Sequence, residues 1–371
     1  MLRTKLDPNE TSLLNRIHCD GLLFLGLLVL MVVGLLTIYS AGGQDMGLIQ
    51  RQVTRLALAI CVMFAVAQIP PKAYQKLAIY FYTLGVLMLI GVLIFGVMGK
   101  GAQRWLDLGG FRFQPSEIMK LAVPMMVAWY ISKFNLPPKL RHILFGFFLV
   151  AVPTLLIARQ PDLGTSLLIA CSGIFALFLA GMSWRFIIGI AVAASAFTPI
   201  MWFFLMKEYQ KQRVLTFLNP ESDPLGSGYH IIQSQIAIGS GGAEGKGWLQ
   251  GTQSQLEFLP ERHTDFIFAV FSEEFGFWGV VGLLAIYAFI VIRGMTIAVR
   301  AQEAFSKILA GSITLTFFVY VFVNMGMVSG ILPVVGVPLP LVSYGGTSMV
   351  TLLAGFGILM AISTQKRLLS R

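Results

Sequence analysis

The chain has 371 residues, of which 56% are hydrophobic and only 12% are charged. A soluble protein of this length needs more polar surface than that, so the composition excludes this class and indicates an integral membrane protein. The formal net charge is +10. We attribute this excess to membrane topology and to contact with anionic membrane lipids, and we expect no nucleic-acid partner.

Apolar runs divide the chain into ten predicted spans, because a helix needs about 20 apolar residues to cross a hydrocarbon layer of about 30 Å. Charge-free runs of sufficient length lie at 21–44, 77–99, 163–184, 186–206 and 308–365, and the last is long enough for two crossings. Shorter apolar runs that complete the set lie at 56–69, 121–132, 143–158 and 275–292. We therefore predict an all-α polytopic membrane protein with ten transmembrane helices in one domain, residues 1–371.

Charge asymmetry predicts the orientation of the spans. With the N-terminus inside, the inside loops carry fifteen basic and four acidic residues, as the positive-inside rule requires of cytoplasmic loops. Residues 1–20 then form a cytoplasmic N-terminal segment, and both termini are cytoplasmic. One large extracytoplasmic loop, residues 207–264, lies between the seventh and eighth spans.

Charged residues occur in the loop after the third predicted span and continue into the fourth span. We expect this loop to lie outside, yet it contains Arg104, and it passes through Pro115 into the fourth span. In that span Glu117 and Lys120 stand three positions apart, so they share one face of the helix. Two opposite charges at this depth either brace the bundle as an ion pair or face a wet cavity.

Two further outside segments carry polar residues. The turn RQPDLGTS favours a capped helix start with Asp162 or Thr165 as the N-cap residue. The large loop contains Arg213 and, at 229–238, an apolar pattern that predicts a short helix at the membrane interface. Its glycine tract, residues 239–251, lacks the features of a nucleotide-phosphate loop, so we interpret it as a flexible lid.

The stretch PERHTDFIFAVFSEEFG concentrates ionisable residues immediately before a charge-free span. Five of them fall within thirteen positions: Glu261, Arg262, His263, Asp265 and Glu273. Carboxylates at a membrane boundary are costly to desolvate, so they are functional candidates. The alternative is a solvated helix entrance, at which Asp265 only interacts with the positive end of the helix dipole.

The segment GILPVVGVPLPLVSYGG, residues 330–346, is rich in proline and glycine and carries no charge. Broken backbone at membrane depth is tolerated only where protein buries it or where it lines a cavity. We therefore expect the hydroxyl groups of Ser343 and Tyr344 to line the same cavity as Asp265.

These residues favour one kind of chemistry over two others. The four histidines have no ligand spacing, so no metal site is predicted; at best Asp265 with Glu261 or Glu117 could hold Mg²⁺ or Mn²⁺. The sequence has no nucleophile elbow of the serine-hydrolase type. A carboxylate base facing cationic groups suits transfer from a donor whose leaving group is a diphosphate.

Several motifs resemble, in order, the signatures of the SEDS (shape, elongation, division, sporulation) family of bacterial cell-wall polymerases, and most closely those of its elongation members. They are GAQRWLDLG, FQPSEIMKLAVP, QPDLGTS, DPLGSGYHIIQSQIAIGSGG, LEFLPERHTDFIFAV and GILPVVGVPLPLVSYGGTS. The resemblance covers the chain from about residue 20 to residue 362. It implies a ten-span peptidoglycan glycosyltransferase of the bacterial inner membrane that polymerises lipid II during cell elongation and rod-shape maintenance. It also implies a class B penicillin-binding transpeptidase as partner.

The resemblance further implies that Asp265 is the catalytic acid. Asp265 would take a proton from the 4-hydroxyl group of the acceptor sugar, which attacks the anomeric carbon of the growing chain in an inverting displacement. The candidate substrate-binding residues are Arg104, Glu117, Lys120, Arg213, Arg262, His263 and Ser343. No cofactor is certain, and a divalent cation stays open. The alternative function is a transporter or flippase for lipid II, although the sequence lacks the internal repeats that transporters usually carry.

Overall fold

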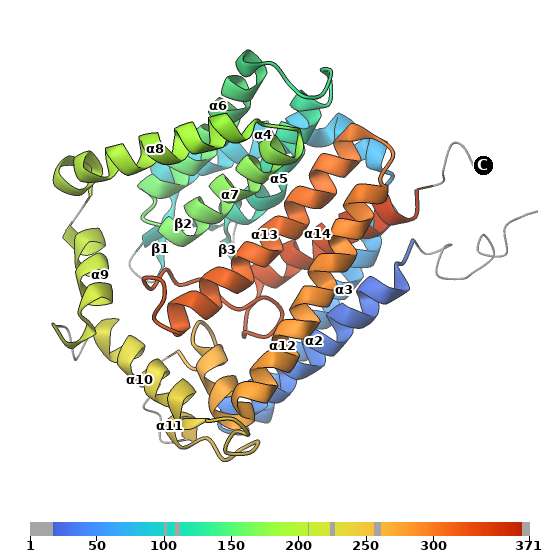
Figure 1. Cartoon of the computed structure of the whole chain (residues 1–371). Helices are drawn as coiled ribbons and strands as arrows, with labels where there is room; N and C mark the ends of the chain where they lie inside the picture. Colours follow the sequence, from blue (N-terminus) through green and yellow to red (C-terminus); the bar gives the residue numbers. More distant parts are fainter. Residues whose placement is uncertain are drawn as a thin grey trace, which may run out of the picture.

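Long helices make up most of the structure, a computed structural model that describes residues 18–99, 102–107, 112–206, 208–222, 227–255 and 261–365. Ten helices of at least 17 residues lie in these ranges: α2 (Gly21–Ala41), α3 (Met46–Ala67), α4 (Pro71–Phe95), α5 (Pro115–Ile131), α6 (Leu140–Arg159), α7 (Leu163–Leu179), α8 (Trp184–Ile200), α12 (Ile267–Arg300), α13 (Ala304–Val328) and α14 (Thr347–Ser363). Figure 1 shows how they bundle together.

Six of these helices, α2, α3, α4, α6, α12 and α13, are long and apolar enough to cross a membrane. The prediction of a multi-pass α-helical membrane protein is confirmed at this level. Helix α13 is the most enclosed of the six, because 72% of its most apolar window is buried. It packs against α5, α7 and α12 and therefore forms the centre of the bundle (Figure 1).

Helix α3 packs closely against α14. A Cβ atom at Gly357 of α14 would lie 2.4 Å from the carbonyl oxygen of Met63 in α3, so only glycine permits this approach. Small residues commonly allow such contacts between membrane helices.

Helix α3 begins earlier than the apolar pattern predicts. The run at 56–69 predicts a short span, but α3 begins ten residues earlier, at Met46, where Asp45 accepts a hydrogen bond from Gly47 N at 2.8 Å.

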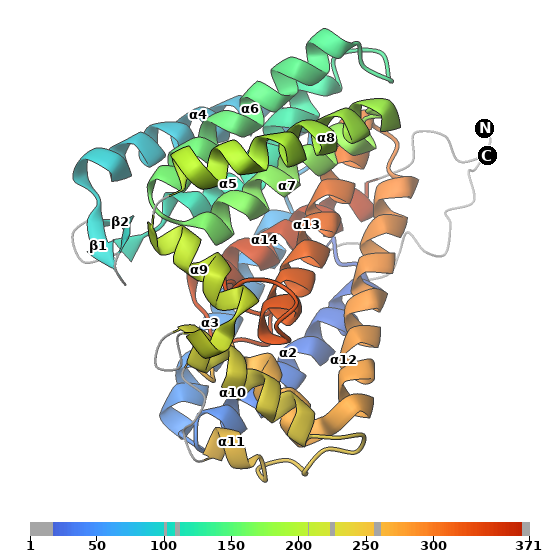
Figure 2. The same cartoon turned by 60° about the vertical axis from the view of Figure 1, so that its left-hand side comes forward.

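A small sheet precedes α5, which the all-α prediction did not include. Strands β1 (Val97–Gly99), β2 (Ala102–Asp107) and β3 (Arg112–Phe113) pair antiparallel in the order β1-β2-β3. Strands this short leave no periodic pattern in a sequence that also has Gly and charged residues between them. The sheet lies beside the bundle (Figure 2) and presents Arg104 on β2.

The segment between α8 and α12 is more ordered than a plain loop. After a π-helical turn at Met201–Leu205 it forms α9 (Glu208–Leu218), a 3₁₀ turn (Pro220–Ser222), α10 (Ser227–Ser240) and α11 (Thr252–Gln255). The short helix predicted at 229–238 is confirmed within α10. Figure 2 shows α9, α10 and α11 following one another along one side of the bundle. Helix α10 packs against α12.

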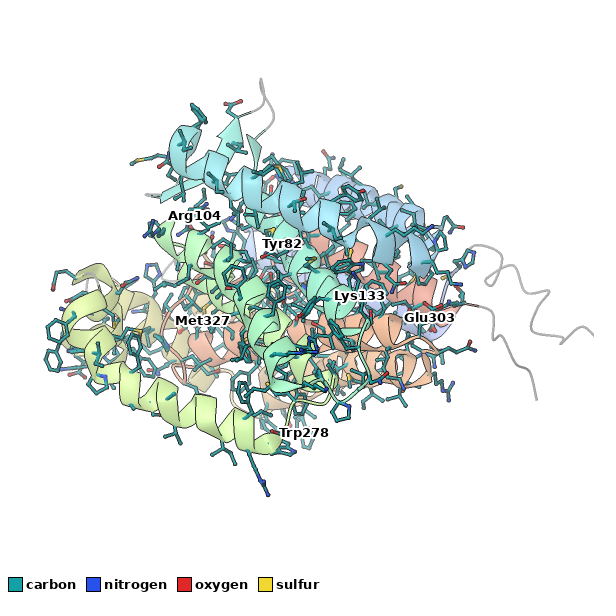
Figure 3. The ribbon with its side chains drawn as sticks, turned by 90° about the horizontal axis from the view of Figure 1, so that it is seen from above. Tyr82, Arg104, Lys133, Trp278, Glu303 and Met327 are labelled. Atoms are coloured by element: carbon teal, nitrogen blue, oxygen red, sulfur yellow. The ribbon has the colours of Figure 1, made fainter. Side chains whose placement is uncertain are left out.

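The bundle has two chemically different ends. At the end that we call the terminal end, His18 Nδ1 lies 2.7 Å from Thr364 Oγ1, which joins the start of α2 to the end of α14. Arg293 pairs there with Asp20 at 2.7 Å. The opposite end, which we call the loop end, carries the sheet, α10, α11 and the start of α12. Figure 3 shows Arg104 and Glu303 on opposite sides of the molecule.

Candidate functional site

The residues before α12 pack against the proline-rich segment 330–346. Ser343 Oγ donates a hydrogen bond to the carbonyl oxygen of Thr264 at 2.6 Å and accepts one from Leu339 N at 2.7 Å. Tyr344 N donates to the carbonyl oxygen of His263 at 2.8 Å. The structure thus brings together the two segments that the sequence analysis placed at one cavity. Ser343 is only 3% exposed, and its hydroxyl group already bonds to backbone on both sides.

Asn324 of α13 fixes the backbone of Asp265. Its Nδ2 donates to the carbonyl oxygen of Asp265 at 2.9 Å and to that of Val337 at 2.7 Å. The side chain is fully buried. Sequence reasoning missed this residue. The available signal is a lone asparagine in the long apolar run 308–365, where an amide group must find partners.

The Asp265 side chain is half-buried and lies just before α12. The N-cap residue of that helix is Phe266, and no side chain caps it. Asp265 therefore does not act as the helix cap. A Cβ atom at Gly336, whose φ is 70°, would lie 3.5 Å from Asp265 Oδ2. The carboxylate thus lies close to the backbone of the 330–346 segment at Gly336.

Cations and aromatic rings lie around this turn. The His263 ring meets the Tyr344 ring edge-on at 5.8 Å between centroids. On the same tyrosine, the guanidinium group of Arg55 from α3 lies 4.6 Å from the ring centroid. Sequence reasoning missed Arg55, because the predicted second span starts after it. Arg262 reaches toward the turn after α2, where its Nη2 lies 4.0 Å from the Cβ position of Gly43.

His230 of α10 is the second histidine near this turn. Its ring stacks on Phe266 at 5.5 Å between centroids. Burial lowers the pKa of His230, and the nearby Glu261 carboxylate opposes this with a weaker upward effect. We therefore expect a neutral His230 at pH 7, so this ring adds no positive charge to the site.

Glu117 and Lys120 form an ion pair inside α5, with Lys120 Nζ 2.7 Å from Glu117 Oε1. Their side chains are only 7% and 10% exposed. Lys120 Nζ also lies 5.3 Å from the ring centroid of Tyr320 in α13. The first of the two interpretations, a bracing pair, therefore describes the contact. Lys120 and Tyr320 also line a cavity with Phe317 and Leu352.

That cavity adjoins a second one beneath the 330–346 segment. Tyr320, Ser348 and Leu352 line both, and Ser343 lines the second. The first cavity is mostly apolar and lies among α5, α13 and α14. Lys120 therefore borders the apolar cavity. The 330–346 segment, which packs against the turn at Asp265, borders the neighbouring cavity with its polar backbone.

Arg104 is anchored to the turn before α7. Its Nη2 donates to the carbonyl oxygen of Pro161 at 2.5 Å, and its Nε lies 3.7 Å from Asp162 Oδ2. Asp162 also accepts a hydrogen bond from Thr165 N at 3.2 Å, which confirms it as the N-cap residue of α7. Arg213 lies in α9, but its side chain is outside the described part of the structure.

Metal coordination has little support from the described side chains. No three His, Cys, Asp or Glu groups converge within the described ranges. Glu261 Oε2 accepts a hydrogen bond from Thr264 Oγ1 at 2.7 Å, so one oxygen of this candidate ligand already has a partner. Mg²⁺ binds through few carboxylates only when substrate phosphates and water supply the rest. A divalent cation therefore stays an open proposal, since substrate groups would have to supply part of its ligands.

The glycine tract is held in place and is not a free lid. Gly245 and Gly241 approach the backbone of α12 so closely that an added Cβ atom would lie 2.2 Å from Glu274 O and from Ser272 O respectively. The tract is hydrogen-bonded on both sides of a break in α12 at Gly276. The prediction of flexibility followed from glycine content. Here the glycines are required by close packing.

The chain matches one protein family along almost its whole length. Residues 13–368 match the model of a family described as "Cell cycle protein", which groups FtsW, RodA and SpoVE. The peptidoglycan glycosyltransferase MrdB of Escherichia coli (strain K12) is 57% identical over 366 residues, covering 98% of this chain and 99% of that protein. The probable peptidoglycan glycosyltransferase FtsW of Geobacter metallireducens is 35% identical over 363 residues, covering 94% and 95%.

Solved structures share the fold as well. A chain of a peptidoglycan synthase complex, described as coordinating polymerization and crosslinking, superposes with a TM-score of 0.81 at 32% identity, covering 93% of this chain and 97% of the other. The rod shape determining protein RodA of Thermus thermophilus superposes with a TM-score of 0.71 at 26% identity, covering 93% and 96%. On the match of residues 13–368 and the 57% identity, this chain belongs to the family of FtsW, RodA and SpoVE.

Proposed function

We propose that this chain is a peptidoglycan glycosyltransferase that joins lipid II units into glycan strands during cell elongation and rod-shape maintenance. The activity agrees with the name of its 57% identical relative, the peptidoglycan glycosyltransferase MrdB. The structural observation that carries the proposal is the placement of Asp265. Asn324 and Ser343 fix the backbone at Asp265 and Thr264, and the Asp265 carboxylate lies close to Gly336 of the 330–346 segment, which lines one of two neighbouring cavities.

Asp265 acts as the general base in this proposal. It takes the proton from the 4-hydroxyl group of the acceptor's N-acetylglucosamine as that oxygen attacks the anomeric carbon of the donor's N-acetylmuramic acid. Undecaprenyl diphosphate leaves, and a single displacement inverts the anomeric centre. No step runs through a metal ion.

Cationic residues at the loop end hold the diphosphate. Arg104 and Lys120 are the candidates whose side chains the structure describes, and Arg213 is the third. The positive charge of Lys120 is balanced by the Glu117 carboxylate, whose Oε1 lies 2.7 Å from Lys120 Nζ. A diphosphate must therefore share the ammonium group with Glu117, which keeps Lys120 oriented toward the cavity. The apolar lining of that cavity suits the polyprenyl tail.

Residues next to Asp265 complete the proposed site. Arg262 and His263 precede it on the same turn, where they place positive charge and a ring near the sugar units. Ser343 holds Thr264 in position through its hydrogen bonds to backbone, and it also lines one of the two cavities, where it can contact the substrate. These roles predict loss of activity for each substitution.

The proposed topology has ten spans, one for each helix of at least 17 residues in the described ranges. Residues 1–371 form a single membrane domain in the bacterial inner membrane, with both termini cytoplasmic and residues 207–264 outside. A class B penicillin-binding transpeptidase is the proposed partner, because the chain shares its fold with a component of a peptidoglycan synthase complex.

Cysteine labelling tests this orientation in cells whose protein lacks the native cysteines. Ser222 and Gln302 are both exposed and lie at opposite ends. An impermeant reagent added to intact cells should label Ser222→Cys and leave Gln302→Cys unlabelled until the membrane is opened. The reverse pattern would invert the topology.

Polymerisation of lipid II by purified protein tests the function directly. Labelled lipid II is incubated with the protein in detergent, with and without the transpeptidase, and the products are separated by length. Glycan strands support the proposal. A break in a membrane helix, as at Gly276, is also typical of transporters. Movement of lipid II across vesicles without strand formation would therefore favour a flippase.

A further inference from the structure

Helix α12 is two helices joined at a break. Gly276 has φ 63° and ψ −163°, which no helix contains, and it divides the element into Ile267–Phe275 and Phe277–Arg300. The short first half follows Asp265 directly and is buried almost throughout. A break in a helix leaves carbonyl oxygens without partners on one side and N–H groups without partners on the other. Buried groups of this kind must be satisfied elsewhere.

Residues 241–253 satisfy the carbonyl side of the break. Lys246 N donates to the carbonyl oxygen of Glu273 at 3.0 Å, and Gly247 N donates to that of Glu274 at 3.0 Å. These are oxygens at the end of the first half of α12. We name residues 241–253 together with Glu273–Trp278 the clasp.

The same segment satisfies the N–H side. Phe277 N donates to the carbonyl oxygen of Gly242 at 2.9 Å, and Trp278 N donates to that of Ala243 at 3.2 Å. One short segment therefore bonds to both halves of α12 and fixes the angle between them. A Cβ atom at Gly276 would lie 2.2 Å from Gly245 N, so the two segments approach each other as closely as two backbones can.

A buried ion pair connects the clasp to the first half of α12. The Glu273 side chain is completely buried. Its Oε1 accepts hydrogen bonds from Lys246 Nζ at 2.7 Å, Thr252 Oγ1 at 3.1 Å and Gln253 N at 2.9 Å. Lys246 Nζ also donates to Thr252 Oγ1 at 2.7 Å. A buried carboxylate with three donors on one oxygen is strongly held, because removing any donor leaves charge unsatisfied.

The ion pair lies two helical turns from Asp265. Glu273 lies eight positions after Asp265, which is about 12 Å at the helical rise of about 1.5 Å per residue. The intervening first half of α12 is a regular buried helix. A shift of the clasp is therefore transmitted along this helix to the turn at Asp265. Asn324 and Ser343 also attach that turn, through hydrogen bonds to the backbone carbonyl groups of Asp265 and Thr264.

We propose that Glu273 and Lys246 are positioning residues for glycosyl transfer, because their buried ion pair fixes the break in α12 and so sets where the Asp265 carboxylate stands relative to the substrate. The inference rests on the proposed function. Neither residue contacts the two cavities beside the site. They act through the helix and not on lipid II itself.

Steady-state kinetics of Glu273→Gln test the proposal, with full-length protein, lipid II as substrate, and rates expressed per folded molecule. The amide keeps the shape but leaves the Lys246 ammonium group without its counter-charge. A catalytic group displaced by about 1 Å can cost about 100-fold in rate. We expect kcat to fall at least ten-fold while KM stays within two-fold of wild type. Lys246→Met should behave in the same way, and Lys246→Arg should retain more activity than Lys246→Met.

Arg293→Met is the matched control. It also breaks an ion pair with a buried carboxylate, that of Asp20, but at the terminal end. We expect a lower melting temperature and an unchanged kcat per folded molecule. An equal loss of kcat in Arg293→Met would show a general effect of destabilisation and would overturn the proposal.

Thr252→Val decides the question if Glu273→Gln does not fold, because it removes only one of the three donors. We expect a two- to five-fold fall in kcat with unchanged KM. A kcat within experimental error of wild type in the folded variants overturns the role of the clasp, provided that wild type makes glycan strands. Wild type that makes none refutes the proposed function instead.

Discussion

The two ends of the bundle use buried charge in different ways. At the terminal end, Asp20 accepts a hydrogen bond from Leu23 N at 3.1 Å and pairs with Arg293 at 2.7 and 3.0 Å, so one carboxylate joins two regular helices. At the loop end, Asp265 stands on irregular backbone that Asn324 and Ser343 hold from outside. A carboxylate that is fully engaged by helix ends braces the fold. One that stands on irregular backbone, held against a segment that lines a cavity, is suited to chemistry.

The largest effect should come from Asp265→Asn, which keeps the shape of the side chain but cannot accept a proton. General-base catalysis contributes about 10²–10⁴-fold, so polymerisation of lipid II should fall by at least that factor. The melting temperature in detergent should stay near that of wild type, because the fold depends on the backbone of this residue. Asp265→Asn protein that makes strands at the wild-type rate would remove the base from this position and promote Glu117.

Arg293→Met should show the opposite pattern to Asp265→Asn. The Arg293 side chain is 25% exposed and that of Asp20 is 5% exposed, so the substitution leaves a largely buried carboxylate without its cation. We expect a loss of about 2–3 kcal/mol of stability, since hydrogen bonds to charged groups are worth about that much. A thermal melt in detergent measures it. An unchanged melting temperature would mean that the terminal end does not depend on this pair.

Arg104→Ala should weaken lipid II binding about ten-fold, because it removes one charge-assisted contact of about 1.5–3 kcal/mol. Lys133→Ala is a suitable control, since that cation stacks on Trp129 at 3.3 Å, away from the site. Binding to the detergent-solubilised proteins can be compared by fluorescence titration. Equal affinities for the two variants would remove Arg104 from the diphosphate site and leave it as an anchor for the turn at Asp162.

Lys72→Ala should have the smallest effect of the four. Lys72 Nζ lies 3.9 Å from Glu303 Oε1, and the lysine side chain is 69% exposed. Exposed pairs typically contribute less than about 1 kcal/mol. Melting temperature and polymerisation should both stay within error of wild type. A clear loss of either would show that the terminal end carries a role beyond bracing.

Sequence reasoning could propose the main residues of the candidate site, because their signals are local. A charge before an apolar run, as at Asp265, and opposite charges three positions apart, as at Glu117 and Lys120, can be seen without knowledge of the fold. The cap at Asp162 is local as well, and the structure confirms it. The motif resemblance added the family, which the comparisons confirm.

Sequence reasoning could not predict contacts between segments that are distant along the chain. Asn324 and Asp265 are 59 positions apart, and Lys246 and Glu273 are 27 apart. No periodicity links such pairs. The glycine tract was interpreted as flexible for the same reason, since composition cannot tell a free loop from one that packs against another backbone. Arg55 was missed because the apolar run stops short of the first turns of α3.

The clasp also restricts the length of the outer segment that forms it. Its backbone bonds pair Gly242 with Phe277 and Lys246 with Glu273, so the number of residues from Gly242 to Lys246 must match the number from Glu273 to Phe277. One residue inserted between Ala243 and Lys246 would put the two halves of α12 out of register with the segment. Insertions and deletions among proteins with this fold should therefore avoid the glycine tract and accumulate ahead of α10, where α9 and the 3₁₀ turn at Pro220–Ser222 can absorb them.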